Sequence, residues 1–211
     1  MNNKKQPGML TFAKDLPNIC SLLGLLSTVI GIYFAIKGNF PASIIAILWA
    51  VLFDWYDGII ARKMKNRTKA QGIFGGQLDS MIDIVSFGVL PAILLLSYGN
   101  YNIWFIPGAF VIIATSAIRL SYFNIYGLVD HKYRGLALDN NVLILSFIFL
   151  FERFFQNATF SIILYTILMV LSALNLSSIL TPKFSGKWIY VLVIYVLVLT
   201  SVFGWILYNR L

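Results

Sequence analysis

Four aspartates within a stretch of 30 residues are the side chains of this sequence whose types and spacing could do chemistry. Asp54 and Asp57 are three residues apart and Asp79 and Asp83 are four apart, so each pair lies on one face of a helix. The chain has only eight acidic residues, and these four lie within or at the end of hydrophobic stretches. Ionisable groups at membrane depth are costly and usually functional.

Four converging carboxylates need cations between them, and hard divalent cations prefer oxygen ligands, so two Mg²⁺ or Mn²⁺ ions are expected. Two such ions would hold a pyrophosphate and stabilise attacking and leaving oxygens. Small residues beside the acids, Gly58, Ala61, Gly75 and Gly76, leave room for a bulky anionic ligand. Two other interpretations stay open, namely structural hydrogen bonding by single aspartates and cation or proton coupling in a transporter.

The composition predicts the elements that hold these acids. With 59% hydrophobic and 11% charged residues and a mean hydropathy of +0.83, the chain is an all-α polytopic membrane protein and not a soluble domain. Hydrophobic stretches predict seven transmembrane helices, over 17–36, 40–61, 73–98, 103–124, 141–155, 159–180 and 188–208. Residues 1–16 form a cytoplasmic or interfacial segment, for which a short helix and an unstructured tail are both open, and 17–211 form a single transmembrane catalytic domain.

The basic residues predict the orientation. With the N-terminus inside, 12 of the 16 Lys and Arg residues lie in cytoplasmic segments, at 4–14, 62–69, 132–134 and 183–187. This distribution follows the positive-inside rule, with the C-terminus outside and the aspartates near the cytoplasmic face. The net charge of +8 therefore reflects membrane topology, and no nucleic-acid partner is expected.

The two aspartate pairs belong to a longer pattern. Asp54-Trp-Tyr-Asp57-Gly58-Ile-Ile-Ala61-Arg62 and Gly75-Gly-Gln-Leu-Asp79-Ser-Met-Ile-Asp83 resemble the signature D-x-x-D-G-x-x-A-R, spacer, G-x-x-x-D-x-x-x-D of the CDP-alcohol phosphotransferase (CDP-alcohol phosphatidyltransferase) family. The spacer, residues 63–74, is longer and more basic than in most members. We interpret its basic residues as topology and anionic-lipid contacts.

The resemblance implies a six-helix core, to which a seventh transmembrane helix is added, and a reaction in which a hydroxyl displaces CMP from a CDP-linked lipid. It implies that Asp54, Asp57, Asp79 and Asp83 hold two divalent cations and that Asp83 is also the general base. It implies a nucleotide and phosphate site at five further positions: Asn18, Gly58, Ala61, Arg62 and Gly75. A homodimer is likewise implied only by the resemblance.

Later stretches resemble the phosphatidylserine synthase branch, among them Asp79 to Ala92 and Arg119-Leu-Ser-Tyr-Phe-Asn124. The implied reaction transfers a phosphatidyl group from CDP-diacylglycerol to L-serine; inositol phosphate, glycerol phosphate, choline and ethanolamine are the alternative acceptors. Candidate acceptor contacts are Arg119, Asp139, Asn140 and Asn141, for which snorkelling of the arginine and helix capping by the others are the plainer interpretations. The aromatic residues are interpreted as lipid-facing or interfacial.

Overall fold

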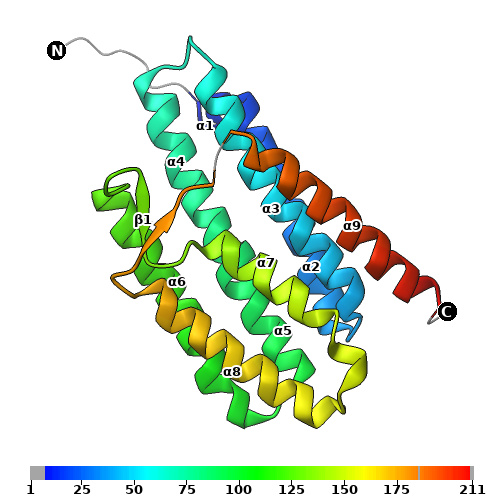
Figure 1. Cartoon of the computed structure of the whole chain (residues 1–211). Coiled ribbons are helices and arrows are strands. Elements are labelled where there is room, and N and C mark those ends of the chain that lie inside the picture. The colour runs from blue at the N-terminus through cyan, green and yellow to red at the C-terminus, as the bar shows by residue number, and fades with distance from the viewer. Residues whose placement is uncertain (1–7, 185, 210–211) are drawn as a thin grey trace.

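The computed structural model describes residues 8–184 and 186–209 as a bundle of long helices (Figure 1). Within these residues, six helices are long and apolar enough to cross a membrane, which confirms the predicted all-α polytopic class. They are α2 (Leu16–Ile36), α3 (Phe40–Lys63), α4 (Lys69–Asp83) continued by the π-helical η1 (Ile84–Val89) and α5 (Leu90–Tyr98), the 3-10 turn η2 (Ile103–Phe105) continued by α6 (Ile106–Tyr126), α8 (Asn157–Asn175) and α9 (Trp188–Tyr208).

The helix predicted over 141–155 is shorter than expected. It is α7 (Leu138–Phe149), and a 3-10 turn, η3 (Glu152–Phe154), follows it. Its 12 residues reach about 18 Å, less than the ~30 Å of a hydrocarbon core, so the described residues hold six helices of spanning length and not seven. Non-helical backbone leads into α7, and Leu136 N donates to Leu174 O of α8 at 3.0 Å. Such backbone is tolerated at membrane depth where protein surrounds it.

Local residues set the helix starts around the acids. Asn39 caps α3 by accepting from Ala42 N at 3.4 Å. A capping box joins Thr68 and Gln71 at the start of α4. Both helices pack against α2, which brings the acid-bearing parts of α3 and α4 to the same end of the bundle.

The helix that carries Asp79 and Asp83 changes to π-helical geometry directly after Asp83. In η1, Ser86 lies against α2, where its Oγ is 2.6 Å from Thr28 Oγ1. Gly88 lies against α6, since a Cβ there would be 3.1 Å from Ser116 Cβ. Because π-bulges are frequent at functional sites, the position of η1 beside Asp83 directs attention to the space that Asp83 faces.

Two three-residue strands, which the sequence analysis did not anticipate, join two distant connections. In β1 (Lys132–Arg134) and β2 (Leu180–Pro182), Tyr133 pairs with Thr181 in antiparallel register. Gly135 follows β1 with a φ of 75°, and a side chain there would collide with the carbonyl of Asn175. The small sheet therefore holds the start of α7 against the end of α8.

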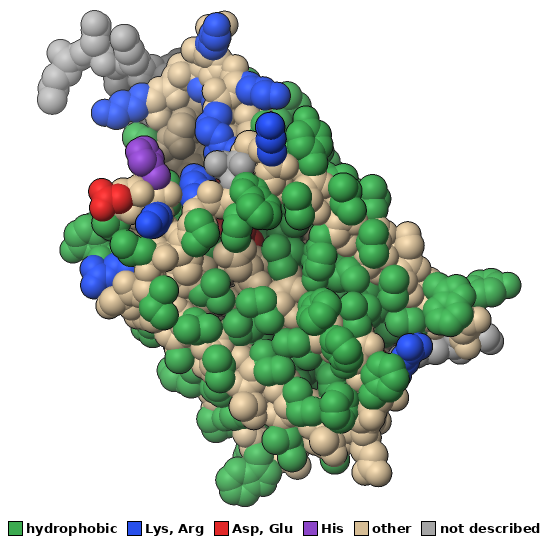
Figure 2. Space-filling view, in the orientation of Figure 1, with side chains coloured by type: hydrophobic (Ala, Val, Ile, Leu, Met, Phe, Trp, Pro, Cys, Tyr) green, Lys and Arg blue, Asp and Glu red, His purple; other side chains and the backbone are tan. Residues whose placement is uncertain are grey.

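The two ends of the bundle differ in chemistry. Lys and Arg side chains gather around the end at which α4 begins, and hydrophobic side chains cover the flank (Figure 2). At the other end, the rings of Tyr98, Phe149 and Phe160 pack together, with centroids 5.0–6.0 Å apart. The short helix α1 (Met9–Ala13) lies at the basic end, where Phe12 stacks on Phe74 at 5.1 Å. Of the predicted segment 1–16, residues 1–7 lie outside the described part, as do Lys4, Lys5 and Arg210 of the charge analysis.

Candidate active site

Three of the four aspartates come together at the basic end of the bundle. Asp54, Asp57 and Asp79 each offer a carboxylate oxygen, and these oxygens lie within 4.8 Å of one another. Asp54 and Asp57 come from one turn of α3, and Asp79 comes from α4, as the helical spacing predicts. Asp57 is the most buried of the three, and Ser21 of α2 donates a hydrogen bond to its Oδ2.

Basic side chains do not neutralise this cluster. Among the described residues, the one ion pair within 4.0 Å joins Arg67 to Asp15, and none involves the four aspartates. Two like charges about 4 Å apart repel by roughly 4 kcal/mol even at an effective dielectric constant of about 20. A set of partly buried carboxylate oxygens without basic partners fits divalent cations with oxygen preference, Mg²⁺ or Mn²⁺.

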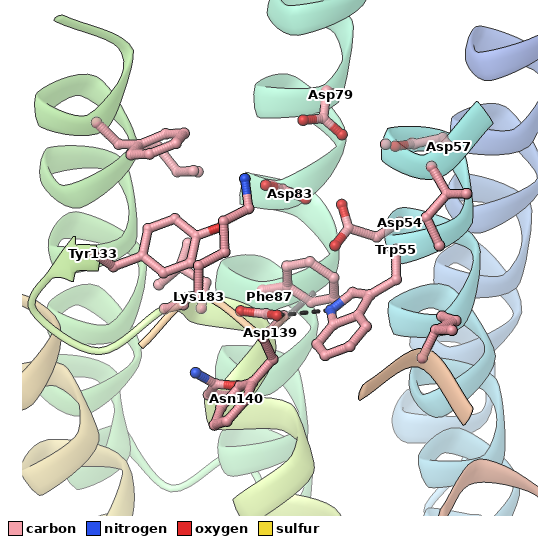
Figure 3. A pocket seen from close by; sticks show the side chains of 18 of the residues that line it. Asp54, Trp55, Asp57, Asp79, Asp83, Phe87, Tyr133, Asp139, Asn140 and Lys183 are labelled. Carbon is pink, nitrogen blue, oxygen red and sulfur yellow. Dashed lines mark hydrogen bonds between the residues drawn. The ribbon is translucent and has the colours of Figure 1, made fainter. Parts of the chain in front are cut away.

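Asp83 lies one turn beyond Asp79, at the last residue of α4. It lines the same cavity of ≈ 210 Å³ as the other three aspartates, which are drawn together in Figure 3. We call these four residues the acidic half of the cavity. The cavity extends from them toward α6, α7 and the segment after β2.

The predicted nucleotide residues fall into two places. Gly58 and Arg62 line the cavity, and the Arg62 side chain folds back on Gly58, where a Cβ would lie 3.2 Å from its Nη1. Asn18 and Gly75 instead meet at the junction of α2 and α4, since a Cβ on Gly75 would lie 2.9 Å from Asn18 Oδ1. Ala61 lies on α3 one turn after Gly58 and does not line the cavity.

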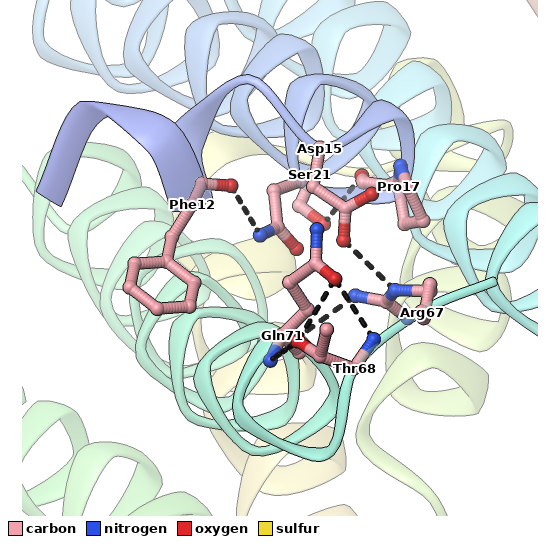
Figure 4. A network of polar contacts seen from close by, with 8 residues as sticks. Phe12, Asp15, Pro17, Ser21, Arg67, Thr68 and Gln71 are labelled. Atoms are coloured by element: carbon pink, nitrogen blue, oxygen red, sulfur yellow. Dashed lines mark hydrogen bonds and ion pairs between the residues drawn. The ribbon is translucent and has the colours of Figure 1, made fainter. Parts of the chain in front are cut away.

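A polar network beside Gly75 uses one residue of the basic spacer (Figure 4). Arg67 Nε donates to Asp15 Oδ2 at 2.8 Å, and the Asp15 side chain is 2% exposed. Asn18 Nδ2 donates to Phe12 O at 2.9 Å. Lys63, Lys65 and Lys69 are exposed, whereas the Arg67 side chain is 14% exposed and pairs with Asp15, so Arg67 is not a lipid contact.

Arg119 does not snorkel to the surface. It is 7% exposed and lines the cavity, and its Nε donates to Leu136 O at 2.9 Å. Its guanidinium carbon lies 5.3 Å from the Tyr133 ring centroid, within cation–π distance. Hydrogen bonding to the residues that lead into α7 therefore holds this cation in the cavity that the four aspartates also line.

The three polar residues at the start of α7 lie in different environments. Asp139 lines the cavity, and its Oδ2 accepts from Trp55 Nε1 at 2.8 Å (Figure 3). Asn140 also lines it. Asn141 does not, and in the amide orientation that satisfies both side chains its Nδ2 donates to the Asn175 oxygen at 2.8 Å. None of the three caps α7 through its side chain, so the capping interpretation is wrong.

Sequence reasoning missed Lys183, Tyr133 and Trp55, which also line the cavity. Lys183 Nζ lies 5.8 Å from the Tyr133 ring centroid. Burial, and after it the charge of Arg62, lowers the pKa of Lys183, and Asp139 opposes this shift. Burial, and after it Asp139, raises the pKa of Tyr133. We call Arg119, Tyr133, Asp139 and Lys183 the sheet half of the cavity. No spacing pattern in the sequence marks Tyr133 or Lys183 as a cavity residue.

Comparisons with known proteins give one family model and several similar relatives. The family model for CDP-alcohol phosphatidyltransferase matches residues 14–209. Archaetidylserine synthase of Methanothermobacter thermautotrophicus is 34% identical over 191 residues, 88% of this chain and 76% of that protein. CDP-diacylglycerol–serine O-phosphatidyltransferases of Methanocaldococcus jannaschii and Helicobacter pylori are 30% and 26% identical, and the matches cover 82% and 88% of this chain and 78% and 79% of those proteins.

Proposed function

The chain belongs to the CDP-alcohol phosphatidyltransferase family, and from this we propose that it transfers a phosphatidyl group from CDP-diacylglycerol to the hydroxyl of L-serine and releases CMP. The relatives named above support serine as the acceptor. The observation that carries the proposal is the single cavity that joins four aspartates to a separate cluster of charged side chains. A transporter is disfavoured, because the family match extends over nearly the whole chain.

We propose that Asp54, Asp57 and Asp79 hold two divalent cations, with Asp83 completing their ligand set. When bound, such ions neutralise the diphosphate and the charge that develops on the departing CMP. Gly58 and Arg62 lie where the donor phosphates would sit, and the absent side chain of Gly58 allows close approach. Asn18 and Gly75 form the adjoining side for the nucleotide.

Asp83 is the proposed general base. As the acceptor oxygen attacks the lipid-side phosphorus, Asp83 takes the hydroxyl proton while the bond from phosphorus to the CMP oxygen breaks. A hydroxyl is a weak nucleophile at neutral pH, so a carboxylate within hydrogen-bond reach accelerates this step. The position of Asp83 between the three aspartates and the sheet half supports this role.

The active site is proposed to face the cytoplasm, with the C-terminus outside. The gathering of Lys and Arg around the end that holds the aspartates supports this orientation. The first described helix and the end of α9 lie at opposite ends of the bundle (Figure 1). Membrane lipids would surround the apolar flank, and a homodimer remains a proposal from family membership.

The proposed function is tested by measuring CMP release from the purified chain in lipid vesicles. The donors are CDP-diacylglycerol and an ether-linked CDP-lipid, each with Mg²⁺ or Mn²⁺, and the acceptors are L-serine, inositol phosphate, glycerol phosphate, choline and ethanolamine. We expect CMP and a serine phospholipid with L-serine and a divalent cation, and neither after chelation. If CMP is released with another acceptor and not with L-serine, that acceptor replaces serine in the proposal. If no acceptor gives CMP release, the proposed enzymatic activity is refuted.

A further inference from the structure

The carboxylate of Asp139 shares the sheet half with Arg119 and Lys183, yet its hydrogen-bond partner is a neutral group. Its Oδ2 accepts from the Trp55 indole at 2.8 Å, and among the described residues no basic nitrogen lies within 4.0 Å of it. A neutral donor orients a carboxylate but does not cancel its charge. The sheet half therefore presents an oriented negative charge to the cavity.

The two cations of the sheet half are also held by neutral groups. Arg119 donates to the Leu136 carbonyl, and both Arg119 and Lys183 lie over the same Tyr133 ring, at 5.3 and 5.8 Å from its centroid. Like charges that share one ring are stabilised by an anion between or beside them. No described carboxylate pairs with either cation within 4.0 Å, so the cavity offers them the space for a ligand anion.

A ligand with one positive and one negative group at short separation complements this arrangement. L-Serine has an ammonium and a carboxylate on one carbon, and its hydroxyl is one carbon further. Choline and ethanolamine lack the anion, whereas glycerol phosphate and inositol phosphate lack the cation. Sites built to bind both charges reject ligands that leave one of them unpaired.

Resting on the proposed function, we propose that Asp139 binds the acceptor ammonium, that Lys183 and Arg119 bind its carboxylate, and that Trp55 is a positioning residue that aims Asp139. The substrate class of this half is therefore a zwitterionic amino acid. Holding both charges leaves the hydroxyl as the free end of the ligand, directed to the acidic half. Trp55 precedes Asp57 by two residues on α3, so it couples the two halves through one side chain.

The test compares L-serine with 3-hydroxypropionate, which lacks the ammonium, and ethanolamine, which lacks the carboxylate. Asp139→Asn should raise the KM for L-serine about 10-fold or more and leave 3-hydroxypropionate unaffected, because a charged hydrogen bond is lost only with serine. Lys183→Gln should likewise raise the KM for L-serine and leave the KM for ethanolamine, which lacks the carboxylate, unaffected. Inhibition by L-alanine, which has both charges and no hydroxyl, should weaken in both variants and gives the same comparison without turnover.

Trp55→Phe keeps an aromatic side chain and removes the indole N–H, so it should raise the KM for L-serine by a smaller factor at constant kcat. In the Asp139→Asn background it should have no further effect. Asp130→Asn is the matched control, since Asp130 is exposed, lies outside the cavity and has a φ of 48° that Asn tolerates; it should change nothing.

The outcomes separate this inference from the proposed function. If wild type releases no CMP with any acceptor, the function itself is wrong. If wild type uses L-serine but Asp139→Asn affects serine and 3-hydroxypropionate equally, Asp139 is structural and the inference is overturned. If Lys183→Gln raises the KM of the CDP-lipid and not that of L-serine, the cations hold the donor phosphates and the carboxylate assignment fails.

Discussion

The acidic half and the sheet half of one cavity are built in different ways. The acidic half takes its residues from α3 and α4, two helices consecutive in the chain, at spacings of three and four residues. The sheet half takes Arg119, Tyr133, Asp139 and Lys183 from four segments, joined by β1–β2 pairing and by bonds to the Leu136 carbonyl and the Trp55 indole. In the proposed function, local helical geometry sets the chemistry, and contacts between distant segments set the choice of acceptor.

If the acidic half performs the chemistry and the sheet half selects the acceptor, substitution of an aspartate in the acidic half should stop turnover with every acceptor. Asp57→Asn should lower kcat at least about 10³-fold, because a metal ligand that contributes several kcal/mol is lost. CMP release with each acceptor and divalent-cation binding by calorimetry check this. A change confined to one acceptor would place Asp57 in the sheet half and break the comparison.

Asp83→Asn probes the boundary between the halves. We expect kcat to fall about 10²- to 10⁴-fold, as for loss of a general base, while the divalent cation and CDP-lipid still bind, because the other three aspartates remain. Turnover and cation titration on the same preparation give the comparison. Normal turnover would remove Asp83 as the base.

Gly135→Ala should displace residues of the sheet half, although Gly135 itself does not line the cavity. A Cβ at this position collides with the Asn175 carbonyl, so the start of α7 must shift. We expect the KM for L-serine to rise several-fold, from displacement of Asp139, and the thermal midpoint to fall, while cation binding is retained.

Gly127→Ala is the control for Gly135→Ala. Gly127 also has a positive φ, 64°, but a Cβ there has no atom within 4 Å, so both variants carry backbone strain of roughly 1–3 kcal/mol and only one adds a collision. Equal KM values in the two variants would show that Gly135 does not hold the sheet half in place.

The smallest expected effect is a pH shift. Because the pKa of Lys183 is lowered, its charge is lost at a lower pH than that of an ordinary lysine, so the KM for L-serine should begin to rise there. The facing charges are Arg62, which lowers this pKa, and Asp139, which raises it. Lys183→Arg, which keeps its charge, should move the rise to higher pH. An unchanged pH profile would exclude Lys183 as its source.

The sequence predicted the acidic half because an acid spaced three or four residues from another faces the same way wherever the helix lies. In the sheet half it predicted Arg119 and Asp139 as acceptor contacts, and both line the cavity, but it missed Tyr133 and Lys183. The strands β1 and β2 have three residues each, too few for an alternating pattern, and they pair across 45 intervening residues (135–179). Trp55 was grouped with the lipid-facing aromatics, since only the position of α7 gives its N–H a partner.

The transmembrane pattern was predicted for the six long helices and failed at α7 for a physical reason. A hydrophobic stretch marks membrane depth, but Asp139 and Asn140 at its start face a cavity and Asn141 faces α8, and none of these environments is visible in the sequence. The family resemblance, based on the two aspartate pairs, is confirmed by the family model, which matches residues 14–209.

The shortness of α7 has a consequence for how the protein is made. A 12-residue helix with an acid and two amides in its first turn is a poor signal for independent membrane insertion. We therefore expect it to enter the bilayer only with support from other segments, among them α3, against which it packs, and α8, where Asn175 and the Leu174 carbonyl bind Asn141 and Leu136. During synthesis, all four aspartates of the acidic half have been made once α4 has emerged, whereas the sheet half is complete only after β2 and Lys183 have been translated.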